Sequence, residues 1–209
     1  MLRPMPPAAA QTQRLSRSES QAQTRAQLVE TAERLFLDEG FRATSLEAVA
    51  ERAGYSKGAV YSNFANKNEL CLAVLDAIHA RQIDDLAAAM TGADTLDERL
   101  AGFERWAEKS VGDPQWTALE LEFAASIRGN EGLVAELTER DRAIREAIAG
   151  IFTTASREMG IELPLPAEDL ATAMLSLGIG LGLRRAYDPS VPVSVLPGVI
   201  RALATSAAG

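Results

Sequence analysis

Hydrophobic positions recur at helical spacing along most of this chain, and no stretch has the strict alternation of apolar and polar residues expected of a half-buried β-strand. The first clear stripe has members at positions i, i+4, i+7 and i+8, namely Leu28, Ala32, Leu35 and Phe36. Gly40 follows, and a glycine there ends a helix near Glu39. The pattern predicts an all-α fold whose first helix buries this stripe.

Two short helices are predicted directly after the first. Thr44 and Glu47 have the spacing of a capping box, which predicts that a second helix starts at Thr44. Gly54 ends this helix early, and Ser56 can cap a third, very short helix. A helix, a tight turn with glycine and a further helix make a helix-turn-helix. The sequence therefore predicts an N-terminal three-helix module of this type.

The third helix predicts a DNA contact through the side chains that it leaves exposed. If Val60 and Phe64 pack inward, its outer side carries Lys57, Gly58, Ala59, Tyr61, Ser62 and Asn63. Gly58 and Ala59 are small enough for close approach to base edges, and Lys57 can donate to guanine or to phosphate. The exposed hydroxyl groups suit phosphate oxygens.

A phosphate ligand is predicted at the start of a fourth helix. Asn66 can cap this helix with Glu69 as its third residue, so Lys67 stands beside a helix N-terminus. Backbone amides and an ammonium group together favour an anion there. Lys67 is therefore the first predicted phosphate clamp.

Residues 24–70 as a whole resemble the DNA-binding domain of the TetR family of bacterial transcriptional regulators. The matching residues are spread over the entire module: Thr24, Arg25, Leu28, Ala32, Leu35, Phe36, Gly40, Phe41, Thr44, Ser45, Ala50, Ala53, Gly54, Ser56, Lys57, Gly58, Tyr61, Phe64, Lys67 and Leu70. The resemblance implies that the exposed side of the third helix faces bases. Ala59 and the Ser62-Asn63 pair depart from the family pattern, so the base preference does not transfer.

The resemblance also implies which residues hold the DNA backbone. Thr44 and Ser45 contact phosphate at the start of the second helix, and Tyr61 and Lys67 bind phosphate further along. With the argument from exposed side chains, the predicted DNA-binding residues are Thr44, Ser45, Ser56, Lys57, Gly58, Ala59, Tyr61, Ser62, Asn63 and Lys67.

Capping and helix-breaking residues predict further helices in the rest of the chain. They cover residues 66–90, residues 95–111, the segment that starts at Asp113-Pro114, residues 132–159, the stretch from the break at 164–166 to about Tyr187, and a last helix ending near Ala204. The fold class is therefore an N-terminal helix-turn-helix domain with a larger C-terminal helical domain.

Three parts are predicted along the chain. Residues 1–20 lack apolar periodicity and form a disordered arm, residues 21–67 form the helix-turn-helix domain, and residues 68–209 form an effector-binding and dimerisation domain. Arg14 and Arg17 either reach a minor groove or belong to a solvated tail. No secretory signal and no membrane span is predicted, which favours a cytoplasmic protein.

Charge is distributed unevenly along the chain. Residues 1–70 contain nine Lys and Arg against eight Asp and Glu, a net charge of +1, whereas residues 71–209 contain twelve against twenty-one, a net charge of −9. An acidic protein is not a typical nonspecific nucleic-acid binder, so a local basic and hydroxyl surface has to supply the affinity. Ordinary surface scatter remains an alternative explanation of the asymmetry.

A dimer interface is predicted in the penultimate helix, where Gly178, Gly180 and Gly182 interrupt apolar residues. Glycine costs a helix about 1 kcal/mol relative to alanine, so such a series suggests close packing. The TetR resemblance implies that the last two long helices pair with their copies in a second subunit. The predicted interface residues are Leu175, Gly178, Ile179 and Gly182, and packing within one chain or a helix bend is the alternative.

An effector cavity is predicted between the helix-turn-helix domain and the helices of the dimer interface. Effector pockets of such regulators are mostly apolar with a few polar anchors. Its predicted lining is Phe103, Trp106, Trp116, Glu120, Phe123 and Phe152, with Glu122, Arg128 or His79 as further polar anchors. Plain core packing is the alternative for each aromatic residue. No cofactor and no metal ion is predicted.

An enzyme is not predicted. Cys71 and His79 lie two helical turns apart, about 12 Å, which is too far for a nucleophile and its base. The predicted function is a ligand-responsive transcriptional repressor that binds a near-palindromic DNA operator as a homodimer and is released by an apolar small molecule. The alternative is a helical protein-interaction adaptor that keeps the helix-turn-helix fold without using DNA.

Overall fold

The computed structural model describes residues 16–91, 93–111 and 114–206, and this part of the chain contains helices and connecting segments but no strand. The helices are α1 (Arg17–Glu39), α2 (Leu46–Ala53), α3 (Lys57–Tyr61), α4 (Lys67–Thr91), α5 (Leu96–Ser110), α6 (Pro114–Ile127), α7 (Glu131–Met159), α8 (Ala167–Arg185) and α9 (Val195–Ser206). The predicted all-α fold is confirmed. None of the helices described here combines the length and apolar character needed to span a membrane.

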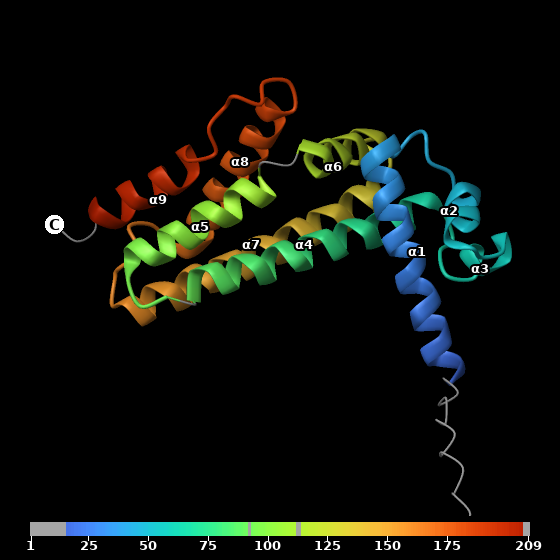
Figure 1. Cartoon of the computed structure of the whole chain (residues 1–209), viewed down its shortest axis with the longest axis horizontal. Helices are drawn as coiled ribbons and strands as arrows, with labels where there is room; N and C mark the ends of the chain where they lie inside the picture. The colour runs from blue at the N-terminus through green and yellow to red at the C-terminus, as the bar shows by residue number, and fades with distance from the viewer. Residues whose placement is uncertain (1–15, 92, 112–113, 207–209) are drawn as a thin grey trace, which may run out of the picture.

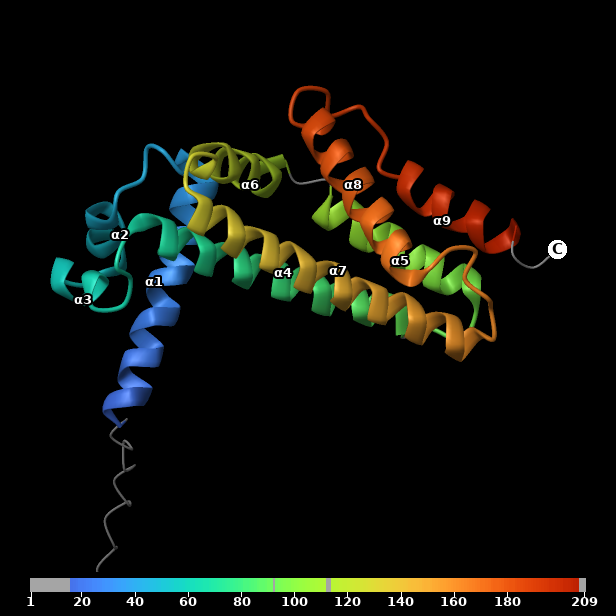
Figure 2. The same ribbon diagram turned by 180° about the vertical axis from the view of Figure 1, so that it is seen from behind.

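The long helices α4 and α7 lie side by side and form the axis of the molecule (Figures 1 and 2). At one end, α1 packs across α4 and carries α2 and α3 on its far side. Towards the other end, α5 packs on α4, α8 packs on α7, and α9 packs on α5. Helix α6 contacts α1, α7 and α8, so it joins the helix-turn-helix end to the larger helical body.

Two apolar clusters hold these layers together. The first combines α1, α2 and α3 with the first half of α4 and with Leu119, Phe123 and Ile127 of α6. The second lies between α5, α7, α8, α9 and the last turns of α4. Because α4 contributes to both clusters without a break, the boundary between residues 67 and 68 stays a prediction.

Local capping signals agree with most of the observed helix ends. Gly54 adopts a left-handed conformation with φ 74° and ends α2 as predicted. Thr95 and Glu98 form the predicted capping box at the start of α5. The predicted cap at Thr44 is wrong, because Ser45 accepts the hydrogen bond from the Ala48 N–H and starts α2.

The predicted disordered arm is too long. Ser16 and Glu19 cap each other's backbone amides, and α1 begins at Arg17. Residues 17–20 are therefore helical, and Arg17 belongs to a helix rather than to an arm. Residues 1–15, with Arg14, lie outside the described residues, as does Asp113, the predicted cap of α6.

Candidate DNA-binding surface and effector cavity

The short helix α3 turns one side into the first apolar cluster and the other side to solvent. Val60 is fully buried and Phe64, just beyond the helix, is 1% exposed, which confirms the predicted inward pair. Lys57 and Gly58 are exposed, and Ala59 is half-buried. The side of α3 predicted to meet DNA is therefore an outer surface.

Gly58 keeps the outer surface of α3 thin. A Cβ atom added there would lie 3.8 Å from the Ser56 Oγ, an ordinary contact distance. Packing within the chain therefore does not require glycine at this position. The space that the missing side chain leaves lies on the solvent side, where a base edge could approach.

Ser45 and Ser56 cap the two helices of the helix-turn-helix. Their hydroxyl oxygens accept hydrogen bonds from the N–H groups of Ala48 (3.1 Å) and Ala59 (3.2 Å). Both serines are exposed, and an accepting hydroxyl still carries a hydrogen that it can donate. The two serines are therefore oriented by the helix starts and remain able to donate to an anion.

Tyr61 lies at the end of α3 with half of its surface exposed. Its hydroxyl donates to the Glu47 Oε1 at 3.1 Å, which ties the end of α3 to the first turn of α2. The backbone N–H of Glu47 and this hydroxyl lower the pKa of the Glu47 carboxyl. Tyr61 is thus held at the rim of the surface with its ring edge accessible.

Lys67 does not have the place predicted for it. Its ammonium donates to the backbone oxygens of Phe41 (2.8 Å), Arg42 (3.3 Å) and Thr44 (3.0 Å), and it lies 4.3 Å from the centroid of the Phe41 ring. These contacts occupy all three ammonium hydrogens. The prediction of a direct phosphate clamp is therefore corrected: Lys67 braces the loop between α1 and α2.

Thr44 is also removed from the contact surface. Its side chain is 1% exposed, and its hydroxyl donates to the backbone oxygens of Gly40 (3.0 Å) and Leu35 (3.3 Å). A buried hydroxyl with these partners cannot reach a phosphate. The prediction of a phosphate contact is wrong for Thr44, whereas Ser45 next to it faces solvent.

The polar residues after α3 mainly hold its end in place. The side chains of Ser62 and Asn63 both donate to the Ala59 backbone oxygen, at 2.9 and 2.8 Å. Arg25 of α1 donates to the Asn63 backbone oxygen at 2.6 Å and lies over the Phe64 ring at 4.1 Å. Ser62 remains exposed, but Asn63 is partly covered, and its predicted base contact is weakened accordingly.

Sequence reasoning missed one basic residue at this surface. A shallow hollow of about 420 Å³ lies between the starts of α2 and α4, and Arg42, Ser45, Tyr61 and Lys67 contribute to its lining. The side chain of Arg42 is 75% exposed. Its position in the short loop after Gly40, which ends α1, was the sequence signal for an exposed basic residue. The hollow brings a guanidinium, two hydroxyl groups and a helix N-terminus together, which is a suitable arrangement for a phosphate.

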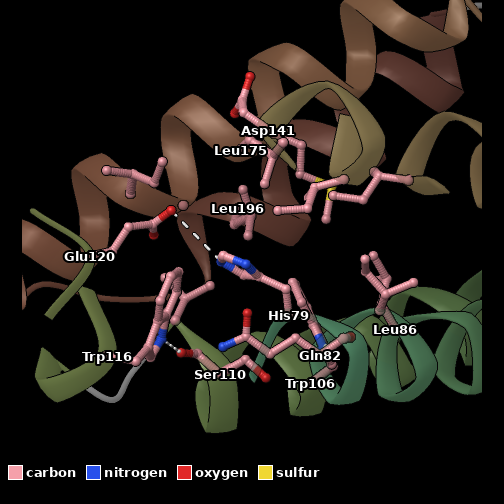
Figure 3. Close-up of a pocket in the computed structure, with 17 residues that line it drawn as sticks. His79, Gln82, Leu86, Trp106, Ser110, Trp116, Glu120, Asp141, Leu175 and Leu196 are labelled. Carbon is pink, nitrogen blue, oxygen red and sulfur yellow. Dashed lines mark hydrogen bonds and ion pairs between the residues drawn. The ribbon is translucent and has the colours of Figure 1, made fainter. Parts of the chain in front are cut away.

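A second candidate site is a cavity of about 60 Å³ enclosed by α4, α5, α6, α7 and α8, with Leu196 of α9 (Figure 3). Trp106, Trp116 and Glu120 line it as predicted. Figure 3 shows that Glu120 points towards His79 across the cavity. His79, one of the predicted polar anchors, thus belongs to the lining, and Gln82 and Asp141 join it without having been predicted.

The three phenylalanines predicted to line this cavity do not line it. Phe103 stacks on Trp106 at 5.4 Å between ring centroids and is 1% exposed. Phe123 is fully buried in the first apolar cluster, with its ring edge against Phe41, and Phe152 is buried in the second cluster. Phe103 and Phe123 pack in the core, the alternative considered for them, whereas Phe152 also lines two other small cavities of about 60 and 70 Å³.

Two predicted polar anchors also lie elsewhere. Glu122 accepts hydrogen bonds from the backbone N–H groups of Phe41 (2.9 Å) and Arg42 (3.1 Å), on the side of α6 that faces α1. Arg128 follows the end of α6 and is exposed. Neither residue lines the cavity.

The pair formed by His79 and Glu120 is buried but not hydrogen-bonded. The His79 Nε2 lies 3.7 Å from the Glu120 Oε1, beyond the usual hydrogen-bond range. Burial lowers the pKa of His79, and burial with the nearby Asp141 raises the pKa of Glu120 to about 7. Both shifts move these groups towards their uncharged forms, so burial disfavours an ion pair between them.

The predicted dimer residues of α8 face inward. Leu175, Gly178 and Ile179 line the cavity. At Gly182 an added Cβ would lie 2.5 Å from the Thr117 Oγ1 of α6, so this glycine allows α6 and α8 to pack closely. These four residues stand at i, i+3, i+4 and i+7 in a single stripe, in which Gly182 is buried and the other three are partly covered, so the predicted interface stays a prediction.

Cys71 and His79 do not form a reactive pair. Cys71 is fully buried in the first apolar cluster, and burial raises the pKa of its thiol. His79 lies beside the cavity instead. In the described part of the chain, no group of three or more His, Cys, Asp and Glu residues is placed to hold a metal ion.

The exposed reading helix and the larger helical body define a helix-turn-helix transcriptional regulator. Residues 28–74 match the model of a family described as bacterial regulatory proteins, tetR family. The N-terminal part of the chain is therefore a domain of the TetR family of bacterial transcriptional regulators. This confirms the resemblance found in the sequence.

Individual relatives agree with this assignment. The HTH-type transcriptional regulator TtgR of Pseudomonas putida is 45% identical over 82 residues, which are 39% of this chain and 39% of TtgR. The HTH-type transcriptional activator FasR of Mycolicibacterium smegmatis is 30% identical over 143 residues, which are 66% of this chain and 61% of FasR. Each match thus spans less than two thirds of the relative. These relatives are named as transcriptional regulators.

Solved structures share the fold over nearly the whole chain. A protein from Rhodococcus sp., described as a TetR-family transcriptional regulator, superposes with a TM-score of 0.70 at 23% sequence identity. The superposition covers 88% of this chain and 99% of that protein. The common architecture therefore extends beyond the helix-turn-helix to the larger helical body.

Proposed function

We propose that this chain is a cytoplasmic, ligand-responsive transcriptional repressor that binds a near-palindromic DNA operator as a homodimer. The observation that carries the proposal is the surface of α3, where Lys57 and Gly58 are exposed while Val60 and Phe64 anchor the opposite side. A thin helix surface rooted in a core is what entry into a major groove requires.

Base reading and phosphate binding fall to different residues in this proposal. Lys57, Gly58 and Ala59 approach base edges. Ser45 and Ser56 donate to phosphate oxygens, and Tyr61 does so when its hydroxyl exchanges the Glu47 carboxylate for a phosphate; the exposed guanidinium of Arg42 adds positive charge at the hollow beside them. Lys67 acts indirectly by fixing the loop that precedes α2.

The homodimer forms through the outer faces of α8 and α9. Ser176, Gly180 and Leu183 of α8, with Tyr187 just beyond its end, stand at i, i+4, i+7 and i+11, on a face about 120° around the helix from the first stripe. Leu183 and Tyr187 are 47% and 71% exposed, and on α9 Val195 and Val199 are each 42% exposed. A twofold dimer places two reading helices in successive major grooves, with half-site centres about 34–36 Å apart.

The effector binds in the cavity beside His79 and Glu120. A cavity of about 60 Å³ is far below the roughly 300–1,000 Å³ of common ligand pockets, so most occupants have to push the surrounding helices apart. We propose that the closed form binds DNA and that the effector selects a wider form in which the two reading helices no longer match the half-sites.

Two helices carry this change to the DNA-binding end. Helix α4 has residues in both apolar clusters, and α6 contributes Trp116 and Glu120 to the cavity while Glu122 holds the loop before α2. Glu120 at the cavity and Glu122 at the loop are only two residues apart, so α6 gives a shorter connection than α4.

A salt titration tests this function against the adaptor alternative. Binding to DNA fragments is measured by fluorescence anisotropy at about 50 to 200 mM salt. Because phosphate contacts release counterions, the observed affinity has to fall steeply over this range. An adaptor predicts no DNA binding at any salt concentration, and that result would exclude the proposed repressor.

A further inference from the structure

The effector cavity has acidic groups but no basic partner for them. Its charged or titratable lining residues are His79 on α4, Glu120 on α6 and Asp141 on α7. Among the described residues that line it, the members from α5 and α8 are apolar or uncharged, and none is Lys or Arg. Because burial lowers the pKa of His79, the imidazole does not supply a permanent positive charge at neutral pH.

The carboxyl groups of Asp141 and Glu120 differ in whether a basic side chain is paired with them. Asp141 accepts a hydrogen bond from the Arg145 Nε at 2.9 Å, one turn further along α7. On α4, Asp76 is similarly paired with Arg140. Within the described residues Glu120 has no such guanidinium or ammonium, and its nearest partner is the uncharged His79 at 3.7 Å. Glu120 is thus the carboxyl group that lacks a counter-ion.

Two tryptophans line the same cavity as this carboxyl group. The indole N–H of Trp106 donates to the Gln82 backbone oxygen (3.1 Å), and that of Trp116 donates to the Ser110 backbone oxygen (2.6 Å). With their N–H groups already bonded, the two indoles offer the cavity only their π-systems and carbon edges. Organic cations are attracted to aromatic rings, most strongly to tryptophan.

We propose that the cavity binds an organic cation, an amine or quaternary ammonium with apolar substituents, with the Glu120 carboxylate as its counter-ion and Trp106 and Trp116 beside it. This inference rests on the proposed function, because it names the chemical class of the effector. Leu175 and Ile179 of α8 complete an apolar wall for the substituents.

The size of the cavity agrees with a small cationic group. A cavity of about 60 Å³ exceeds the roughly 10–15 Å³ that a single water molecule needs, so it has room for a small group. A compact trimethylammonium head therefore enters first. Any longer apolar substituent then requires α8 to move away from α4 and α6, which is the opening that the repressor mechanism uses.

Binding of a permanent cation is coupled to the proton on Glu120. With the pKa of Glu120 raised to about 7 in the empty cavity, part of the protein holds a protonated carboxyl at neutral pH. The cation favours the carboxylate, so binding releases this proton. The affinity therefore rises as the pH rises through about 7 and becomes constant above it.

The test compares phenyltrimethylammonium with tert-butylbenzene, which has the same shape without the charge. The two tryptophans of the chain both line the cavity, so the intrinsic tryptophan fluorescence of the full-length protein reports on occupancy. We expect the cation to bind at least about tenfold more tightly than its neutral counterpart, in line with desolvated cation–π and charge-pair energies. We also expect its affinity to rise between about pH 6 and 8.

Substitutions separate Glu120 from general charge effects. Glu120→Gln is expected to lower the cation affinity by about tenfold, remove its pH dependence and leave tert-butylbenzene within about twofold. Glu146→Gln removes an exposed carboxylate of α7 outside the cavity and is expected to change neither affinity. If Glu120→Gln folds poorly, the pH dependence of the cation affinity of the wild-type protein still tests the proposal.

Three results would overturn the proposal: equal or tighter binding of tert-butylbenzene, a cation affinity that does not depend on pH, or no fluorescence response to either compound. Tighter binding of the neutral compound would identify a site for uncharged effectors. The measurements use no DNA, so their outcome does not depend on whether operator binding is established.

Discussion

Glu120 and Glu122 stand two positions apart on α6 and serve opposite sides of that helix. Glu120 lines the cavity, whereas Glu122 accepts hydrogen bonds from the backbone N–H groups of Phe41 and Arg42 in the loop before α2. Residues two apart on a helix are separated by about 200° around its axis. A displacement of α6 by a ligand beside Glu120 therefore acts directly on the loop that Glu122 holds.

The first prediction concerns this connection. Glu122→Ala removes two backbone hydrogen bonds to a carboxylate and is expected to lower the free energy of unfolding by about 1–3 kcal/mol. It is also expected to reduce the effect of phenyltrimethylammonium on DNA affinity while leaving binding of that cation in place. Thermal unfolding and anisotropy with and without the cation measure both effects. Glu146→Ala is the control, and an unchanged ligand effect in Glu122→Ala would exclude α6 as the route.

The second prediction concerns the thin surface of α3. Gly58→Ala is expected to leave the free energy of unfolding unchanged or to raise it by up to about 1 kcal/mol, because alanine favours a helix and the added Cβ has room. DNA affinity is nevertheless expected to fall by about 1–3 kcal/mol, since the methyl group separates α3 from the bases. Gly150→Ala in α7, where a Cβ meets nothing within 4 Å, is the control for both measurements. Full DNA affinity in Gly58→Ala would disprove the close approach.

The third prediction compares the contribution of Lys57 to DNA binding with that of a lysine elsewhere on the surface. Lys57→Ala is expected to weaken DNA binding and to reduce the slope of log affinity against log salt by about 1 if Lys57 contacts a phosphate. If Lys57 contacts a guanine instead, specificity relaxes at one base-pair position. Lys109→Ala on α5 has the same change in net charge on an exposed side chain of the larger helical body, where no DNA contact is expected. Equal effects of the two substitutions would argue against a local contact at Lys57.

The fourth prediction concerns the homodimer. Leu183→Glu is expected to convert the dimer to a monomer, because it introduces charge into the outer stripe of α8, and the helical content is expected to stay unchanged. Leu165→Glu is a matched control, because Leu165 is also 47% exposed but precedes α8. Sedimentation equilibrium measures the molar mass of both variants. A Leu183→Glu protein that remains dimeric would require a different interface.

Helix ends could be predicted well because their signals are local. A glycine with positive φ at Gly54 and the reciprocal contacts of Thr95 and Glu98 need only a few neighbouring residues. The start of α2 was misplaced by one residue because Thr44 and Ser45 both carry hydroxyl groups. Burial of Thr44 against the end of α1 decided between them, and such burial is a property of the tertiary fold.

The face of α8 could not be predicted for a related reason. Gly178 and Gly182 lie on one side of the helix and Gly180 on the other, so the sequence contains two small-residue stripes with no local sign of which is covered. Thr117 and Val111, which are far from α8 in the chain, lie against Gly182 and Gly178 of the first stripe. The prediction of the aromatic lining was partly wrong for a similar reason. Phe103 and Trp106 are neighbours in space, but only the indole of Trp106 lies at the cavity.

Selection of bound sequences from random DNA by the purified full-length protein shows whether a pair of α3 helices reads a symmetric operator. We expect enrichment of one near-palindromic sequence, with half-site centres separated by about 10–10.5 base pairs or a multiple of this distance. Enrichment has to disappear with Gly58→Ala or shift to a different sequence. Recovery of no common sequence, or of a single site without twofold symmetry, would contradict the account.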